Sequence, residues 1–219
     1  AITGATGFIG QHLLSHLVQR QDLALRALTH RTADTQLSKS ARLHWVRGDL
    51  ADLTTCEGLL ATGCTFINLA FPAHWSRDVH LKTTFNLARA VAQQGVRRVI
   101  HCSSAVVVGA SPADKVTEAT ECRPQTEYEK IKLEIEEAWR HHAAGRFELV
   151  IARPTAVFGP NGKNLLKLAA ALATGNKFVN YLRSSLFARR RMNLACVRSV
   201  VNALEFMIDS KTHFDGSTF

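Results

Sequence analysis

Short apolar runs rich in branched residues alternate along this chain with longer stretches in which apolar residues recur every three or four positions. The first pattern predicts strands at six places: Ile2–Thr3, Leu23–Leu28, Leu43–Val46, Thr65–Ala70, Val96–Ser103 and Glu148–Ala152. The second pattern predicts helices between most of them. Strands joined by helical crossovers form a parallel sheet with helices on both faces. The sequence therefore predicts an α/β fold built on a doubly wound parallel sheet.

The composition changes after Pro160, where arginine becomes frequent (Arg183, Arg189, Arg190, Arg191 and Arg198). We therefore expect a first domain over residues 1–160 and a smaller second region over residues 161–219. Only three residues precede the first glycine, and Ser217–Phe219 has the character of a strand that is just beginning. We expect residues to be missing at both ends, so that the second region is incomplete.

The overall composition is typical of a folded domain, with 219 residues of which 46% are hydrophobic and 21% charged. No apolar run approaches the roughly 18 residues that a transmembrane helix needs, and no secretion signal is visible. We expect a cytoplasmic protein with no membrane partner. The five cysteines are odd in number and lack a Cys-x-x-Cys pair, and the histidines lack further ligands, so no disulfide framework or metal site is expected.

The net charge of +9 suits either a nucleic acid or a phosphate-bearing cofactor or substrate. The run Arg189–Arg191 has no interleaved aromatic residues and belongs to no nucleic-acid-binding motif. We therefore expect a small-molecule substrate, with phosphate groups as one option, and no nucleic-acid partner.

Three glycines, Gly4, Gly7 and Gly10, follow the first predicted strand and open a helix. Glycines in such a turn permit a tight bend and let the backbone approach a pyrophosphate, whose charge the helix N-terminus stabilises. The alternative is a tight strand-to-helix turn without a ligand. Because the turn lies at the start of an alternating series of strands and helices, we favour a dinucleotide site.

The second predicted strand leads into Thr29, His30 and Arg31, with no acidic residue. About 20 residues beyond the turn, a dinucleotide site carries an acidic residue for the ribose of NAD or an arginine for the 2′-phosphate of NADP. Arg31 therefore favours NADP, with NAD as the other option. The alternative is that Arg31 is a solvated loop cation.

Tyr128 and Lys132 are four residues apart in a predicted helix and therefore share one face, and Ser104 follows the fifth predicted strand. A neighbouring ammonium favours the phenolate, so we expect Lys132 to lower the pKa of Tyr128 into a useful acid–base range. The Ser104 hydroxyl would hold the substrate oxygen. Taken alone, Tyr-x-x-x-Lys also describes a half-buried tyrosine beside a surface lysine.

Together these motifs resemble the NAD(P)-dependent epimerase/dehydratase family, also called the extended short-chain dehydrogenases/reductases. The resemblance covers residues 1 to about 160 and is carried by Ile2–Gly10, Gly48–Leu50, Asn68–Ala70, Ser103–Ser104, the spaced residues Pro124, Tyr128, Lys132 and Glu136, and Arg153–Pro160.

The resemblance implies a Rossmann domain over residues 1–160 and part of a substrate-binding region over residues 161–219. It implies that Tyr128 is the catalytic acid–base, that Lys132 holds the nicotinamide ribose, and that Ser104 binds the reacting oxygen. The cofactor-binding residues would be Gly4, Thr6, Gly7, Phe8, Ile9, Arg31, Asp49, Leu50, Ala70, Tyr128, Lys132 and Pro154. A homodimer formed through helices, including the one that bears Tyr128, is a further expectation.

Four positions depart from the family pattern. Ala105 and Val106 stand where sugar dehydratases carry an Asp-Glu pair, so dehydration is not expected. Val108 replaces a common tyrosine and His80 replaces an asparagine, and both changes affect the substrate pocket.

We therefore expect an NAD(P)-dependent oxidoreductase or epimerase that acts on a secondary alcohol or ketone, with a sugar nucleotide as the favoured substrate. The arginine cluster favours the epimerase, because arginines clamp diphosphates well. Arg31 favours the first alternative, an NADPH-dependent reductase of a non-sugar ketone. A second alternative is a non-catalytic NAD(P)-sensing protein, which would not need the pair Tyr128 and Lys132.

Overall fold

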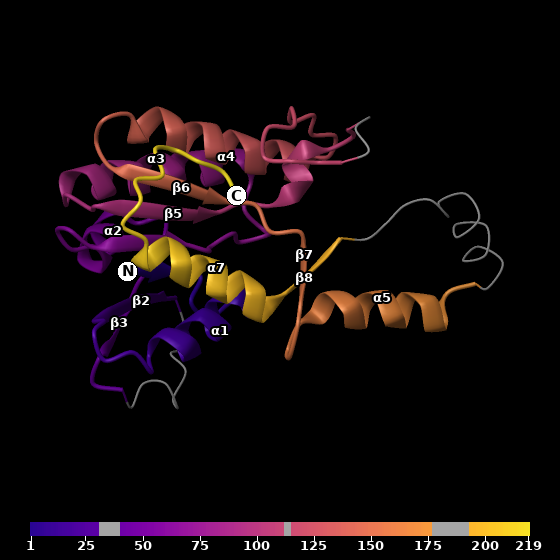
Figure 1. The fold of residues 1–219 in the computed structure, drawn as a ribbon, viewed down its shortest axis with the longest axis horizontal. Coiled ribbons are helices and arrows are strands. Elements are labelled where there is room, and N and C mark those ends of the chain that lie inside the picture. The colour runs from indigo at the N-terminus through magenta and orange to yellow at the C-terminus, as the bar shows by residue number, and fades with distance from the viewer. Residues whose placement is uncertain (31–39, 112–114, 177–192) are drawn as a thin grey trace.

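The computed structural model describes residues 1–30, 40–111, 115–176 and 193–219. Six parallel strands form the main sheet in the order β3–β2–β1–β4–β5–β6 (Figure 1). Their bounds are β1 Ile2–Thr3, β2 Leu25–Thr29, β3 Leu43–Arg47, β4 Thr65–Asn68, β5 Arg98–Cys102 and β6 Glu148–Ala152. The six predicted strands and their parallel arrangement are confirmed, and the strand order is that of a Rossmann sheet.

Helices cover both faces of this sheet (Figure 1). One face packs against α1 (Phe8–Leu17) and α7 (Val197–Asp209), whose buried residues include Leu13, Leu17 and Leu204. The other packs against α2 (Leu53–Leu59), α3 (Arg77–Gln93) and α4 (Glu127–Ala143), with Leu59, Leu87 and Trp139 among the buried residues. Burial of these two apolar layers holds the helices against the sheet.

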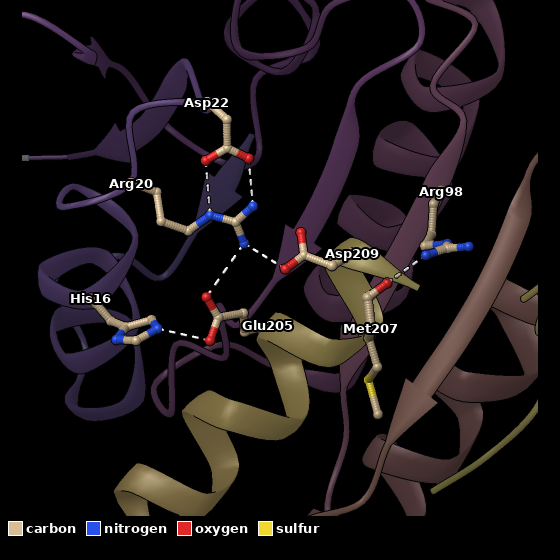
Figure 2. Close-up of polar contacts among 7 residues, drawn as sticks. All are labelled: His16, Arg20, Asp22, Arg98, Glu205, Met207 and Asp209. Carbon is tan, nitrogen blue, oxygen red and sulfur yellow. Dashed lines mark hydrogen bonds and ion pairs between the residues drawn. The ribbon is translucent and has the colours of Figure 1, made fainter. Parts of the chain in front are cut away.

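Ion pairs join the outer surfaces of α1 and α7 (Figure 2). Glu205 of α7 lies 2.8 Å from His16 Nε2 and 3.3 Å from Arg20 Nη1. Arg20 also pairs with Asp22 and Asp209. Single exposed pairs contribute little, but this connected set fixes α7 beside α1 on the main sheet.

A second, two-stranded parallel sheet is formed by β7 (Ala156–Phe158) and β8 (Leu194–Cys196), which the sequence analysis did not predict. Between them in sequence, α5 (Lys163–Thr174) extends away from the main sheet (Figure 1). After α7, Ser217–Phe219 runs parallel to β6 through a bridge between Thr218 and Ile151, as its strand-like pattern predicted.

No helix in the described ranges is long and apolar enough to span a bilayer. Among the same residues, no group of three or more histidine, cysteine or acidic side chains is placed to hold a metal ion.

Candidate active site

The glycine turn packs backbone against backbone where β1, α1 and β4 meet. Gly4 has φ +69°, and a Cβ added there would lie 2.7 Å from the backbone nitrogen of Ala70. A Cβ on Gly10 would lie 2.1 Å from the Gly4 carbonyl oxygen. The Gly7 N–H donates to the Gly4 carbonyl at 2.9 Å. Side chains at Gly4 and Gly10 are therefore excluded by the turn itself.

The N-terminus of α1 carries backbone donors that no side chain satisfies. Gly7 is the N-cap residue, it makes no side-chain capping bond, and the first turn contains no acidic residue. Thr6 and Gly7 are exposed, whereas Phe8 and Ile9 are half-buried. Free N–H groups and the positive end of a helix dipole suit a pyrophosphate, so these residues fit a dinucleotide.

The other predicted cofactor residues lie at the same, carboxyl edge of the sheet. Asp49, which is exposed, and Leu50, which is buried, follow β3, and Ala70 follows β4. Pro154 follows β6, and its carbonyl accepts from the Ala105 N–H at 3.0 Å. The structure thus brings these residues to the edge that carries the glycine turn. Arg31 lies outside the described residues.

Helix α4 brings Tyr128 and Lys132 to the end of β5. Thr126 and Glu129 form a capping box that starts the helix just before Tyr128. Tyr128 is 45% exposed and Lys132 is buried. The Lys132 ammonium donates to the carbonyl oxygen of Cys102, the last residue of β5, at 3.2 Å.

Ser104 begins the short 3₁₀ helix η2 (Ala105–Val108) directly after β5. Its hydroxyl interacts with Tyr128 and in this way lowers the tyrosine's pKa. The three residues predicted to be catalytic therefore lie together, although they come from two elements.

The pKa of Tyr128 differs from the prediction. Burial raises it above the usual value of 10.0, the Cys102 side chain adds to the rise, and Ser104 opposes it. Lys132 is not among the groups that shift it, so the predicted lowering of the Tyr128 pKa by Lys132 is wrong for this structure. Burial is the largest influence on the Tyr128 pKa. The Lys132 ammonium binds the Cys102 carbonyl, and burial lowers the pKa of Lys132 itself.

One aromatic residue at the site, Phe71, was not predicted to act there. The Phe71 ring stacks on His80, with 4.2 Å between the ring centroids, and meets Tyr128 edge-on at 5.2 Å. The Lys132 nitrogen lies 4.5 Å from the Phe71 centroid. Phe71 directly follows the predicted motif Asn68–Ala70. An aromatic residue next to that motif is the sequence signal by which Phe71 could have been assigned to the site. The ring therefore contacts two of the three predicted catalytic side chains, Tyr128 and Lys132.

A buried polar row crosses the three central strands beneath this site. Thr3 Oγ1 donates to Asn68 Oδ1 at 2.7 Å, and Asn68 Nδ2 lies 3.3 Å from His101 Nδ1. Burial, with smaller effects of Lys132 and Arg140, lowers the pKa of His101 far below its usual value, so the ring is neutral. The row ties β1 to β4 and β5 at the point where the strand order reverses.

Three comparisons show what the chain is similar to. It is 29% identical to the sterol demethylase protein B of Methylococcus capsulatus, covering 73% of this chain and 51% of that protein. It is 27% identical to the UDP-glucose 4-epimerase of Vibrio cholerae, covering 95% of this chain and 66% of that protein. The structure of a dTDP-glucose 4,6-dehydratase from Streptomyces venezuelae with NAD superposes with a TM-score of 0.79 at 17% identity, over 100% of this chain and 73% of that one.

The chain thus spans about half to two thirds of the length of these curated relatives. The solved structure shares the fold. The sequence model of the NAD dependent epimerase/dehydratase family matches residues 1–215, which is almost the whole chain. The chain therefore belongs to the NAD dependent epimerase/dehydratase family.

Proposed function

We propose that the protein is an NAD(P)-dependent oxidoreductase or epimerase that acts on a secondary alcohol or ketone, with Tyr128 as acid–base. One observation carries this proposal: α4 sets Tyr128 and Lys132 beside Ser104, at the sheet edge that also carries the glycine turn. Ligands of doubly wound sheets bind at this edge, where the strand order reverses.

Each side chain has a distinct role in the proposed reaction. The nicotinamide, when bound, supplies or accepts a hydride. Tyr128 gives the proton of its phenol to a substrate carbonyl oxygen on reduction and takes a hydroxyl proton on oxidation. The Ser104 hydroxyl donates a hydrogen bond to that oxygen. Lys132 holds the cofactor ribose, and the Phe71 ring covers the ammonium on one side.

The favoured substrate is a sugar nucleotide, and the match to a UDP-glucose 4-epimerase supports this choice. The matches to a sterol demethylase protein and to a putative dihydroflavonol 4-reductase support the alternative, reduction of a non-sugar ketone. We further propose that the protein does not dehydrate sugars, because Ala105 and Val106, which follow Ser104 in η2, bear no carboxylate. The fold likeness to a dehydratase does not decide between these reactions, because folds host many reactions.

We propose NADP as the cofactor on the strength of Arg31, with NAD as the other option. We also propose that the part of residues 161–219 formed by α5 and the β7–β8 sheet serves the substrate, because it extends from the carboxyl edge (Figure 1). Helix α7, by contrast, packs on the main sheet.

Substitution of Tyr128 tests the proposed chemistry. In the whole protein, Tyr128→Phe should reduce turnover about 10²–10⁴-fold while changing NAD(P) affinity far less, because the ring stays and only the proton-donating hydroxyl is lost. Turnover is measured with UDP-glucose and, separately, as NADPH oxidation with a panel of ketones. Full turnover by a folded Tyr128→Phe protein that binds cofactor would refute the assignment.

The dinucleotide that copurifies with the protein separates the alternatives. An epimerase returns its hydride to the same substrate and need not release the cofactor, so tightly held NAD indicates epimerisation. Exchangeable binding with a preference for NADPH indicates a reductase. Cofactor binding without turnover of any substrate class would favour the sensing protein.

A further inference from the structure

A cleft lies at the amino edge of the main sheet, where β5 and β6 begin. Its volume is about 710 Å³, and its walls are the turn between α4 and β6 and the segment that follows α7. Figure 1 shows both segments at the end of the sheet opposite to β7 and β8. The cleft is therefore remote from the glycine turn and from Tyr128.

The floor of this cleft is a neutralised ion pair. Arg98 is buried and uses all five N–H donors inside the protein: two go to Glu148 and three to the carbonyls of Met207, Ser210 and Thr212. The bond to Met207, which caps the end of α7, is drawn in Figure 2. Arg98 and Glu148 therefore form the floor of the cleft and leave no unpaired charge on that floor.

The mouth of the cleft is positively charged. Arg97, Arg146 and Lys211 line it and are exposed, and none of them has a carboxylate partner among the described residues. Asp215 is the lining carboxylate that Arg98 does not neutralise. Three cations facing one carboxylate in a concave surface focus a positive potential. The wall also contains apolar groups, among them Ala143 and Phe147.

We propose that this basic cleft, formed by Arg97, Arg146 and Lys211 around the Arg98–Glu148 floor, binds a small anion that carries at least two phosphate charges. Its volume is within the range of small-ligand sites. Exposed ammonium and guanidinium groups suit phosphates, and the apolar wall suits a nucleoside. Residues Ser217–Phe219 run beside β6 toward its carboxyl end, away from the cleft.

This site is distinct from the dinucleotide site. Ala144, the residue that caps the end of α4, comes 12 positions after Lys132. At 1.5 Å per residue, the two residues are about 18 Å apart along the helix. A ligand held at Ala144 and Arg146 therefore leaves the glycine turn free. The proposal does not depend on the reaction proposed above.

Calorimetric titration of inorganic pyrophosphate and of ADP into the whole protein tests the site, at one fixed salt concentration and with saturating NAD present. NAD would fill the proposed dinucleotide site, so binding that persists takes place outside it, and the cleft variant then shows whether the cleft or the proposed substrate site holds the anion. We expect both anions to bind, and the double variant Arg146→Gln/Lys211→Gln to weaken both at least tenfold.

The matched control is Lys82→Gln/Arg89→Gln, which removes the same charge from two exposed positions of α3. It should change affinity less than twofold, and circular dichroism shows whether each variant is folded. The proposal is overturned if NAD displaces both anions, if the cleft variant binds as tightly as the natural chain, or if the control weakens binding equally.

Discussion

The ammonium nitrogen of Lys132 lies over the ring of Phe71, 4.5 Å from its centroid. Lys132 is 5% exposed and forms no ion pair in the described part of the chain. The ring face and the Cys102 carbonyl, 3.2 Å away, therefore stabilise a buried positive charge. Burial lowers the pKa of Lys132, as expected for a cation with so little contact with water.

Removal of the Phe71 ring should impair the reaction. A desolvated cation–π contact contributes about 2 kcal/mol, so we expect Phe71→Leu to lower turnover roughly 10- to 30-fold. The control is Phe85→Leu, because Phe85 is 50% exposed on α3 and contacts His142 rather than the site. Steady-state kinetics measure the turnover of both variants. Equal turnover by Phe71→Leu and Phe85→Leu would show that the Phe71 ring does not support Lys132.

Titration of Tyr128 tests the sign of its pKa shift. The chain contains two tyrosines, so Tyr181→Phe leaves Tyr128 as the sole phenol. Because burial disfavours the phenolate, ultraviolet absorbance should show ionisation with a midpoint above pH 10. Adding Ser104→Ala should move the midpoint higher, since Ser104 lowers the pKa. A midpoint below 10 in the cofactor-free protein would mean that Lys132 outweighs burial.

The sequence predicted the main sheet because its central strands are buried on both faces and read as continuous apolar runs, such as Val99 and Ile100. It did not predict β7 and β8. Each has three residues, and their pairing joins Ala156 to Leu194 across 38 positions. A hydrophobic pattern within a few residues cannot reveal a pairing between strands so far apart in the sequence.

Much of the candidate site was likewise predictable, but its electrostatics were not. Helical spacing placed Tyr128 and Lys132 on one face. The direction of the ammonium depends on the Cys102 carbonyl and on Phe71, which is 61 positions from Lys132 in the chain. Local spacing therefore predicted proximity, whereas tertiary packing determined the pKa of Tyr128.

Two helical glycines offer a matched test of the turn. A Cβ on Gly10 would overlap the Gly4 carbonyl at 2.1 Å, whereas a Cβ on Gly58 in α2 would meet nothing within 4 Å. We expect Gly10→Ala to cost about 1–3 kcal/mol or more and to abolish NAD(P) binding. Gly58→Ala should stabilise the protein by about 0.5–1 kcal/mol. Urea denaturation measures the stability of each variant, and cofactor titration measures its affinity for NAD(P). Unchanged NAD(P) binding by Gly10→Ala would contradict the close approach of β1 and α1.

The pair Arg98 and Glu148 should make stability depend on pH. Burial by itself raises the pKa of Glu148, but Arg98 and the Phe214 N–H together lower it below the usual 4.5. The unfolded chain then binds the proton more tightly, so this stabilisation is complete above about pH 4.5 and is lost as the pH falls through the folded-state pKa.

Substitution of Arg98 should reverse this dependence. Arg98→Met leaves a buried carboxylate without its charged partner, which costs about 3–5 kcal/mol at pH 7 and raises the pKa of Glu148. Protonation of Glu148 at lower pH removes this buried charge. The difference in the free energy of unfolding between the variant and the natural chain should therefore become smaller from pH 7 to pH 4. The control is Arg77→Met, which breaks a 2.7 Å surface pair with Glu134 and should cost under about 1 kcal/mol. Urea denaturation at both pH values measures the difference, and a difference that is constant would show that Glu148 is not charged in the folded variant.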